Sequence, residues 1–153
     1  MNDQELLDSS IEKILHVLPP LYRWMQAQRL RISKEVRLTR PQWEVLTGLA
    51  REPGLTLTEV SQQLGIAKSN LVGTVDELVS RGLVEKGAHP QGGRSVALVV
   101  TQAGNALYHD LRGRFRELTA QGLAQLDAET LRRVLEGLDG LDPLSEVLTK
   151  MSD

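Results

Sequence analysis

Residues Leu38 to Tyr108 carry the most informative pattern of the chain: LTRPQWEVLTGLAREPGLTLTEVSQQLGIAKSNLVGTVDELVSRGLVEKGAHPQGGRSVALVVTQAGNALY. Two short helices are predicted, one before and one after Gly65. Thr56 and Glu59 form a capping box that opens the first, and Gly65 can adopt the left-handed backbone that ends it. The second helix is expected from about Lys68 to just before Gly82.

Two short strands are predicted after that helix, at 83–88 and 94–100, joined by the flexible tip HPQGG. Val96, Leu98 and Val100 alternate, which predicts one buried face on the second strand. The fold class is therefore mainly α with a small β-hairpin wing. In a winged helix-turn-helix lobe, expected here over residues 38–104, one helix lies in a DNA groove and the wing touches the flanking backbone.

Helices are also predicted on both sides of this lobe. Residues 4–18 carry a helical apolar stripe, which Pro19-Pro20 is expected to stop before a second helix that lasts to about Lys34. Thr39 and Gln42 predict a capping box at the start of the helix that carries Trp43.

A long helix is predicted from Thr101 to about Leu126, and Asp127 is expected to cap the next one. Asp142-Pro143 then precedes a last apolar turn. These terminal helices have more apolar surface than a small lobe can cover. We therefore expect a single domain over 1–153 whose segments 1–37 and 105–153 form a helical dimerisation region.

Composition excludes several classes of protein. The 153 residues contain no cysteine, which excludes disulfides, cysteine-ligated zinc and thiol-based redox sensing. No apolar run reaches the roughly 20 residues of a membrane span, and no signal-peptide pattern opens the chain, so we expect a cytoplasmic protein without a membrane partner. The net charge is −2, and residues 39–104 carry six basic and six acidic groups, so non-specific DNA binding should be modest.

The helix from Lys68 carries the residues expected to read DNA. With about 100° of turn per residue, the core side takes Leu71, Val75, Leu78 and Val79. The opposite face is small and polar near its start; Asn pairs with adenine, Ser donates or accepts, and Val or Thr meets a thymine methyl. The alternative is an ordinary solvated helix face. The expected DNA contacts on this helix are Lys68, Ser69, Asn70, Gly73 and Thr74.

Two residues of the hairpin tip complete the expected DNA site. Arg94 is placed to insert a guanidinium into a minor groove; the alternative is a surface arginine that pairs with Glu85. His89 is a candidate contact or a solvated turn residue. Asp76 and Glu77 would repel phosphates, so we expect them to pair with structural basic groups.

The chain resembles the MarR family of bacterial transcriptional regulators. The matching pieces are Leu38-Thr39 with WEVL at Trp43, then LTLTEVSQQLGIAKSNLVGTVDELVSRGLVEK, then GRSVALVVTQAGNAL. The resemblance implies a homodimer whose winged lobes grip a pseudo-palindromic operator in double-stranded DNA. It also implies release by a small effector molecule bound between the dimerisation region and the lobe.

The chain departs from the family pattern at several positions. Gly73 stands where an arginine is common, and Glu77 where a basic residue is common. The family's Asp-x-Arg wing motif reads Gly92-Gly93-Arg94, which keeps the arginine without its acidic partner. Ala67 replaces a common capping serine, which forgoes about 1 kcal/mol.

The few large side chains near the expected effector pocket define a candidate ligand site. Its members are His16, Tyr22, Arg23, Met25 and Trp43, with Trp24 beside them. Tyr22 and Trp43 offer aromatic surface, and Arg23 or His16 could meet an acidic group. The alternative is that these side chains pack the junction between helices.

No catalytic or cofactor site is predicted. His16, His89 and His109 are far apart in the sequence, and no Gly-rich loop joins a strand to a helix. We therefore expect a homodimeric DNA-binding regulator, most often a repressor in such families, with no metal and no cofactor. The alternative hypotheses are a winged-helix protein that binds protein instead of DNA, and an enzyme.

Overall fold

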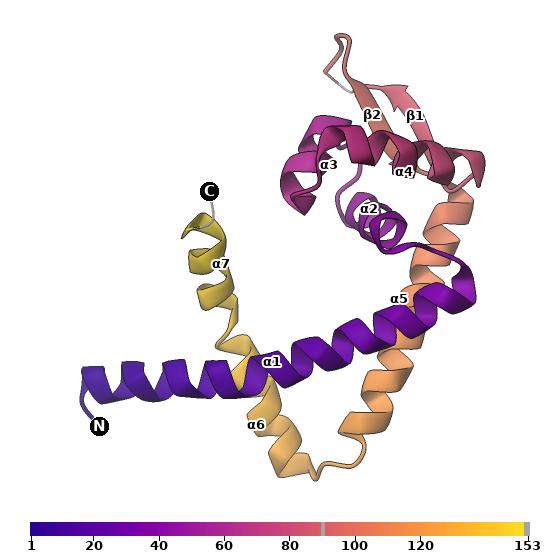
Figure 1. Ribbon diagram of the computed structural model, residues 1–153. Helices are drawn as coiled ribbons and strands as arrows, with labels where there is room; N and C mark the ends of the chain where they lie inside the picture. The colour runs from indigo at the N-terminus through magenta and orange to yellow at the C-terminus, as the bar shows by residue number, and fades with distance from the viewer. Residues whose placement is uncertain (90, 152–153) are drawn as a thin grey trace. The chain divides into compact units, whose positions relative to one another are not determined.

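The computed structural model describes residues 1–89 and 91–151, which form seven helices and one hairpin (Figure 1). The described chain divides into two compact units, Met1–Arg114 and Phe115–Asp153. The elements in order are α1 (Asp3–Val36), α2 (Arg40–Arg51), α3 (Leu57–Leu64), α4 (Lys68–Ser80), β1 (Val84–Ala88), β2 (Val96–Val100), α5 (Gln102–Leu123), α6 (Ala128–Asp139) and α7 (Asp142–Met151). The mainly helical fold with a two-stranded wing is confirmed.

The prediction that Pro19-Pro20 ends the first helix was wrong, because α1 continues through both prolines. Each proline lacks an N–H, so the carbonyls of Leu15 and His16 lose their helical partners. The apolar stripe keeps its three- and four-residue spacing across the prolines. That uninterrupted period, rather than the proline pair, indicated the correct length.

The helix starts of the lobe follow the predicted caps. Thr39 and Gln42 form a capping box at α2, and Thr56 and Glu59 form one at α3. Hydrogen bonds from the backbone N–H and hydroxyl of Thr56 lower the pKa of the Glu59 carboxyl. Gly65 ends α3 in the left-handed region with φ 63°. Ala67 gives α4 no side-chain cap, as its methyl group requires.

The core of the lobe is aliphatic and lies where α2, α4 and the hairpin meet (Figure 1). Val45, Leu46 and Leu49 of α2 are at most 1 % exposed. Leu71, Val75 and Leu78 of α4, Val60 of α3, and Val84, Ala97 and Leu98 of the hairpin are buried as well. The predicted core residue Val79 is only half-buried, at the edge of this cluster.

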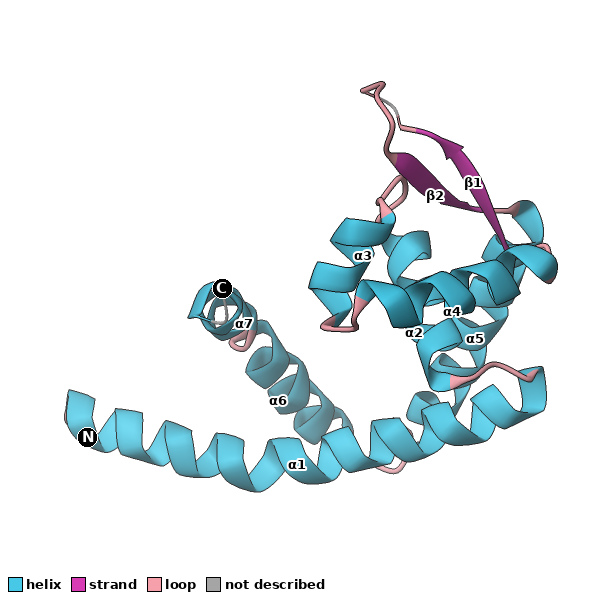
Figure 2. Ribbon diagram, turned by 45° about the horizontal axis from the view of Figure 1, so that its top comes forward, coloured by secondary structure: helices cyan, strands magenta, loops and turns pink. Residues whose placement is uncertain are grey.

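The hairpin is antiparallel, with Val84 opposite Val100 and Ala88 opposite Val96 (Figure 2). The predicted alternation on β2 is wrong at Val96, which is 47 % exposed, whereas Ala97 and Leu98 are both buried. The reason is a third strand segment. Thr56 bridges Ala97, and the Leu98 N–H donates to the Leu55 carbonyl at 2.9 Å, so the segment before α3 covers this part of β2.

The second unit contains the end of α5 with α6 and α7. Asp127 caps α6 as predicted, accepting a hydrogen bond from the Thr130 N–H at 2.7 Å. No residue of α6 or α7 is buried, and Leu135, Leu138, Val147 and Leu148 are each more than half exposed. Within the described residues, no helix is long and apolar enough to cross a bilayer.

Gly104 is the glycine of α5 for which packing leaves no room. A methyl group there would overlap the carbonyl oxygen of Leu83 and lie 2.6 Å from Cγ1 of Val100. We expect Gly104→Ala to destabilise the protein by about 1–3 kcal/mol, as overpacking does. Gly113→Ala is the matched control on the same helix, because nothing lies within 4 Å of its added methyl. Chemical denaturation should show the control as stable as the parent or more so; equal effects of the two changes would contradict this packing.

Candidate nucleic-acid interface

Helix α4 turns its apolar side inward and leaves its opposite face uncovered. Leu71, Val75 and Leu78 are 0 %, 2 % and 0 % exposed. They lie three or four residues apart and therefore share one face of the helix. The uncovered residues of its N-terminal half are Lys68, Ser69, Asn70, Val72 and Gly73.

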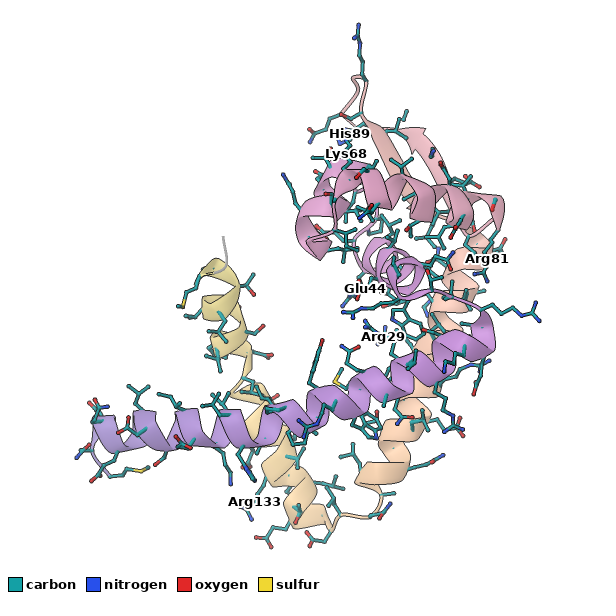
Figure 3. The ribbon with its side chains drawn as sticks, in the orientation of Figure 1. Arg29, Glu44, Lys68, Arg81, His89 and Arg133 are labelled. Atoms are coloured by element: carbon teal, nitrogen blue, oxygen red, sulfur yellow. The ribbon has the colours of Figure 1, made fainter. Side chains whose placement is uncertain are left out.

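Two of the predicted contacts on α4 already have partners within the lobe. The Lys68 ammonium donates to Oγ1 of Thr58 at 3.0 Å, so it is held beside α3 (Figure 3). Thr74 is half-buried, and its hydroxyl donates to the Asn70 carbonyl at 3.3 Å. Ser69 and Asn70 are exposed on the first turn, and Gly73 one turn further on. The structure thus gathers the predicted α4 residues at one end of the helix.

Both acidic residues of α4 have hydrogen-bond partners within the lobe. Asp76 pairs with Lys86 of β1 at 2.7 Å, which confirms the predicted basic partner. Glu77 instead accepts a hydrogen bond from the side-chain amide of Gln42, so the prediction that it pairs with a basic group was wrong. Gln42 is buried and is held by the α2 capping box, which leaves its amide nitrogen free to reach α4.

The C-terminal end of α4 is bound to the end of α1, a connection that the sequence did not reveal. The Arg81 guanidinium donates to the carbonyls of Arg37 at 2.7 Å and Val36 at 3.2 Å. Arg37 caps α1 in the left-handed region with φ 55°, which turns these carbonyls away from helical partners. No local pattern encodes a bond across 44 residues.

The wing tip carries Arg94 two residues before the start of β2. Among residues 1–89 and 91–151, Arg94 forms no ion pair, and the register places Glu85 opposite Val99 rather than near the tip. His89 is half-buried, and its Nδ1 accepts from the Gln91 N–H at 3.2 Å, as in a turn residue. Arg94 is thus an uncommitted cation of the lobe.

A hollow of about 310 Å³ lies beside α4. It opens between the start of α2 and the α3–α4 turn, and Asn70 and Thr74 form one of its walls. Its full lining is Arg40, Pro41, Glu44, Leu64, Ile66, Asn70 and Thr74. None of the predicted ligand residues lines it.

The predicted ligand residues are not brought together within the chain. Trp43 is 7 % exposed and belongs to the core, whereas Tyr22 and Met25 are exposed on α1. Met25 follows His16 by nine residues, which at about 100° per residue places it on the opposite side of the helix. Arg23 lies two turns from His16 and shares its side.

Helix α1 is tied to α2 by a charged cluster that the predicted ligand set did not include. Glu44 accepts from Arg29 of α1 at 3.2 Å and from Arg40 of α2 at 3.1 Å (Figure 3). Glu35 of α1 pairs in turn with Arg114 of α5 at 2.8 Å. The exposed Glu35–Arg114 pair contributes little stability by itself, whereas the side chains of Arg29 and Glu44 are only 18 % and 22 % exposed.

Comparison with known proteins agrees with this architecture. The model of the MarR family matches residues 38–95, the span that contains α2, α3, α4 and the wing tip. Residues 38–95 thus form a winged-helix lobe of the MarR type.

Its relatives include transcriptional regulators from several bacteria. The regulator PetP of Rhodobacter capsulatus is 28% identical over 146 residues, covering 90% of this chain and 84% of PetP. The homoprotocatechuate degradative operon repressor of Escherichia coli is 26% identical over 108 residues, covering 71% of this chain and 73% of the repressor. The transcriptional regulator Tm0710 from Thermotoga maritima has a similar fold, with a TM-score of 0.74, 21% identity, and coverage of 88% and 96%. This chain is thus a transcriptional regulator of the MarR type.

Gly73, where MarR proteins often carry an arginine, has no packing role inside the lobe. Nothing lies within 4 Å of a methyl group built at this position, and its φ is not in the left-handed region. A glycine inside a helix costs about 0.5–1 kcal/mol relative to alanine. Its presence on the outer face is therefore not explained by the folded chain alone.

We expect Gly73→Ala to raise the free energy of unfolding by about 0.5–1 kcal/mol, because it removes this cost. Gly65→Ala is the matched control; it also meets open space, but its φ of +63° is strained for alanine, so it should destabilise by about 1 kcal/mol or more. Urea denaturation of both variants measures the difference. A destabilised Gly73→Ala protein would show that the outer face of α4 is packed in a way that this structure lacks.

Proposed function

We propose that this MarR-type regulator is a homodimeric repressor. Its lobe at 38–104 binds a pseudo-palindromic operator, and a small apolar or aromatic ligand releases it. The main support is the exposed polar turn of α4 at Ser69 and Asn70, combined with an uncommitted Arg94 on the wing. In this proposal α4 enters the major groove, and Arg94 reaches the minor groove beside it.

A titration of binding against salt concentration tests this function directly. Protein that neutralises phosphates releases counterions, so the logarithm of the binding constant falls linearly with the logarithm of salt. Random duplex should give weak binding with a shallow slope, and operator fragments selected from genomic DNA should bind far more tightly. A winged helix that binds protein instead would show no salt-dependent slope on either duplex.

Arg94 and Asn70 should contribute in different ways. Arg94→Ala should weaken binding to most sequences and lower the salt slope by about one unit per wing, because a full charge is lost. Asn70→Ala should leave the slope intact and cost about 1–3 kcal/mol of discrimination at one base pair per half-site. Binding isotherms at several salt concentrations measure both. Arg133→Ala on α6 removes the same charge elsewhere and should leave the slope unchanged; an unchanged slope for Arg94→Ala would exclude the wing from the interface.

The homodimer is supported by the apolar residues left uncovered in α6 and α7. Leu135 is 60 % exposed and shares a face with Leu131, Val134 and Leu138. Leu135→Asp should therefore dissociate the dimer or prevent its folding, since obligate dimers often lack a stable monomer. Arg133→Asp, on the opposite side of α6, should leave the mass measured by light scattering unchanged. A Leu135→Asp protein that stays a folded dimer would contradict this interface.

Release by a ligand is supported by the exposed aromatic and thioether side chains of Tyr22 and Met25. The name of the Escherichia coli relative also ties that repressor to homoprotocatechuate, an aromatic acid. Aromatic acids of this class should lower operator affinity reversibly and change the emission of Trp24. Chelators and mild peroxide should not do so. Reversible loss of binding under peroxide, with methionine oxidation excluded by mass spectrometry, would contradict this mode of release.

A further inference from the structure

The outer face of α4 lacks the side chains that most often read guanine. Arginine or lysine bonded to O6 and N7 of guanine is the commonest specific base contact. No arginine occurs between Lys68 and Ser80, and Lys68 is the only lysine there. Its ammonium is held by Thr58 at 3.0 Å, at the very start of the helix.

The cations next to α4 are engaged as well. Lys86 is bound to Asp76 at 2.7 Å, and Arg81 donates to two carbonyls at the end of α1. Arg40, across the hollow from Asn70, pairs with Glu44 at 3.1 Å. Releasing any of them to a base would break a bond that the lobe already makes. Guanine readout from this helix is therefore disfavoured.

The same face offers groups suited to adenine and thymine. Asn70 is exposed, and an Asn amide bonds to N6 and N7 of adenine. Val72, two residues further on, is 44 % exposed although its side chain is apolar. An apolar side chain on this face can contact the C5-methyl group of thymine, which is the apolar feature of the major groove.

On the surface of α4, only small residues lie between these two side chains. Ser69 and Gly73 lie one turn apart on the outermost line of α4, flanked by Asn70 on one side and Val72 on the other. Gly73 has open space around it and no packing role. A low central line lets the helix approach the base edges closely enough for short side chains to touch them.

We propose that α4 reads A·T pairs in each half-site, with Asn70 on an adenine and Val72 against a thymine methyl. This inference rests on the proposed DNA binding and names the sequence class that it selects. Specificity then comes from the hydrogen bonds of an uncharged amide and from a methyl contact rather than from charge.

The test uses the full-length protein and an operator obtained by selection from random duplex. Each thymine of the half-site is then replaced by uracil, which removes only the methyl group. We expect one position per half-site to lose about fourfold in affinity, the effect of one buried methyl group, and the symmetric pair to lose roughly fifteenfold. Val72→Ala should bind the thymine operator more weakly and lose its sensitivity to uracil at that position. Val99→Ala, an exposed valine on β2 that is 42 % accessible, should retain the full sensitivity.

Each outcome decides the inference. Uracil sensitivity that disappears only in Val72→Ala supports it, and excludes a change in DNA flexibility as the cause. A selected half-site dominated by G·C pairs, or a parent protein indifferent to uracil, overturns the inference while leaving DNA binding intact. Absence of any salt-dependent binding overturns the proposed function and this inference with it.

Discussion

The apolar contact of α4 with α2 sets the orientation of every other residue of α4. Leu71, Val75 and Leu78 occupy one side of α4 and are almost completely buried, against the aliphatic face of α2. Truncating such a leucine to alanine typically costs about 2–5 kcal/mol, far more than any surface bond of the lobe contributes. This burial fixes the rotation of α4 about its axis. The identity of its outer face, and hence any contact with DNA, follows from that rotation.

The polar bonds around α4 add a second restriction, on charge rather than on rotation. Asp76 is paired with the ammonium of Lys86, whereas Glu77 accepts a hydrogen bond from the uncharged amide of Gln42 and keeps its negative charge. Of the basic groups nearby, Lys86 is paired with Asp76, and Lys68 and Arg81 donate hydrogen bonds to uncharged oxygens. The outer face of α4 beyond Lys68 carries no positive charge, and on the wing Arg94 forms no ion pair with the described residues.

Local rules predicted the parts of this structure that depend on a few neighbouring residues. The capping boxes, the left-handed Gly65 and the Asp127 cap each need only three or four residues, and all are present. Pro19 misled because a proline removes one helical hydrogen bond without necessarily ending the helix, and α1 continues through both prolines. The bond between Gln42 and Glu77 spans 35 residues and depends on the packing of α2 against α4. Such contacts carry no local signature, so neither they nor the scattered ligand residues could be placed from sequence.

A regulator with few basic side chains available to phosphates binds all DNA more weakly, but it discriminates better between its operator and other sequences. Non-specific binding comes almost entirely from phosphate neutralisation and so scales with the number of free basic groups. Base-edge contacts act only at the correct site, and the genome offers a vast excess of incorrect ones. The central segment has six basic and six acidic groups, and the groups nearest α4 are paired. Under the proposed function, such a lobe would spend little time on random DNA, and two lobes linked in a dimer would restore affinity where both half-sites match. The proposed base readout by α4 and the proposed dimer therefore support each other: linkage of two lobes supplies the affinity that few phosphate contacts cannot.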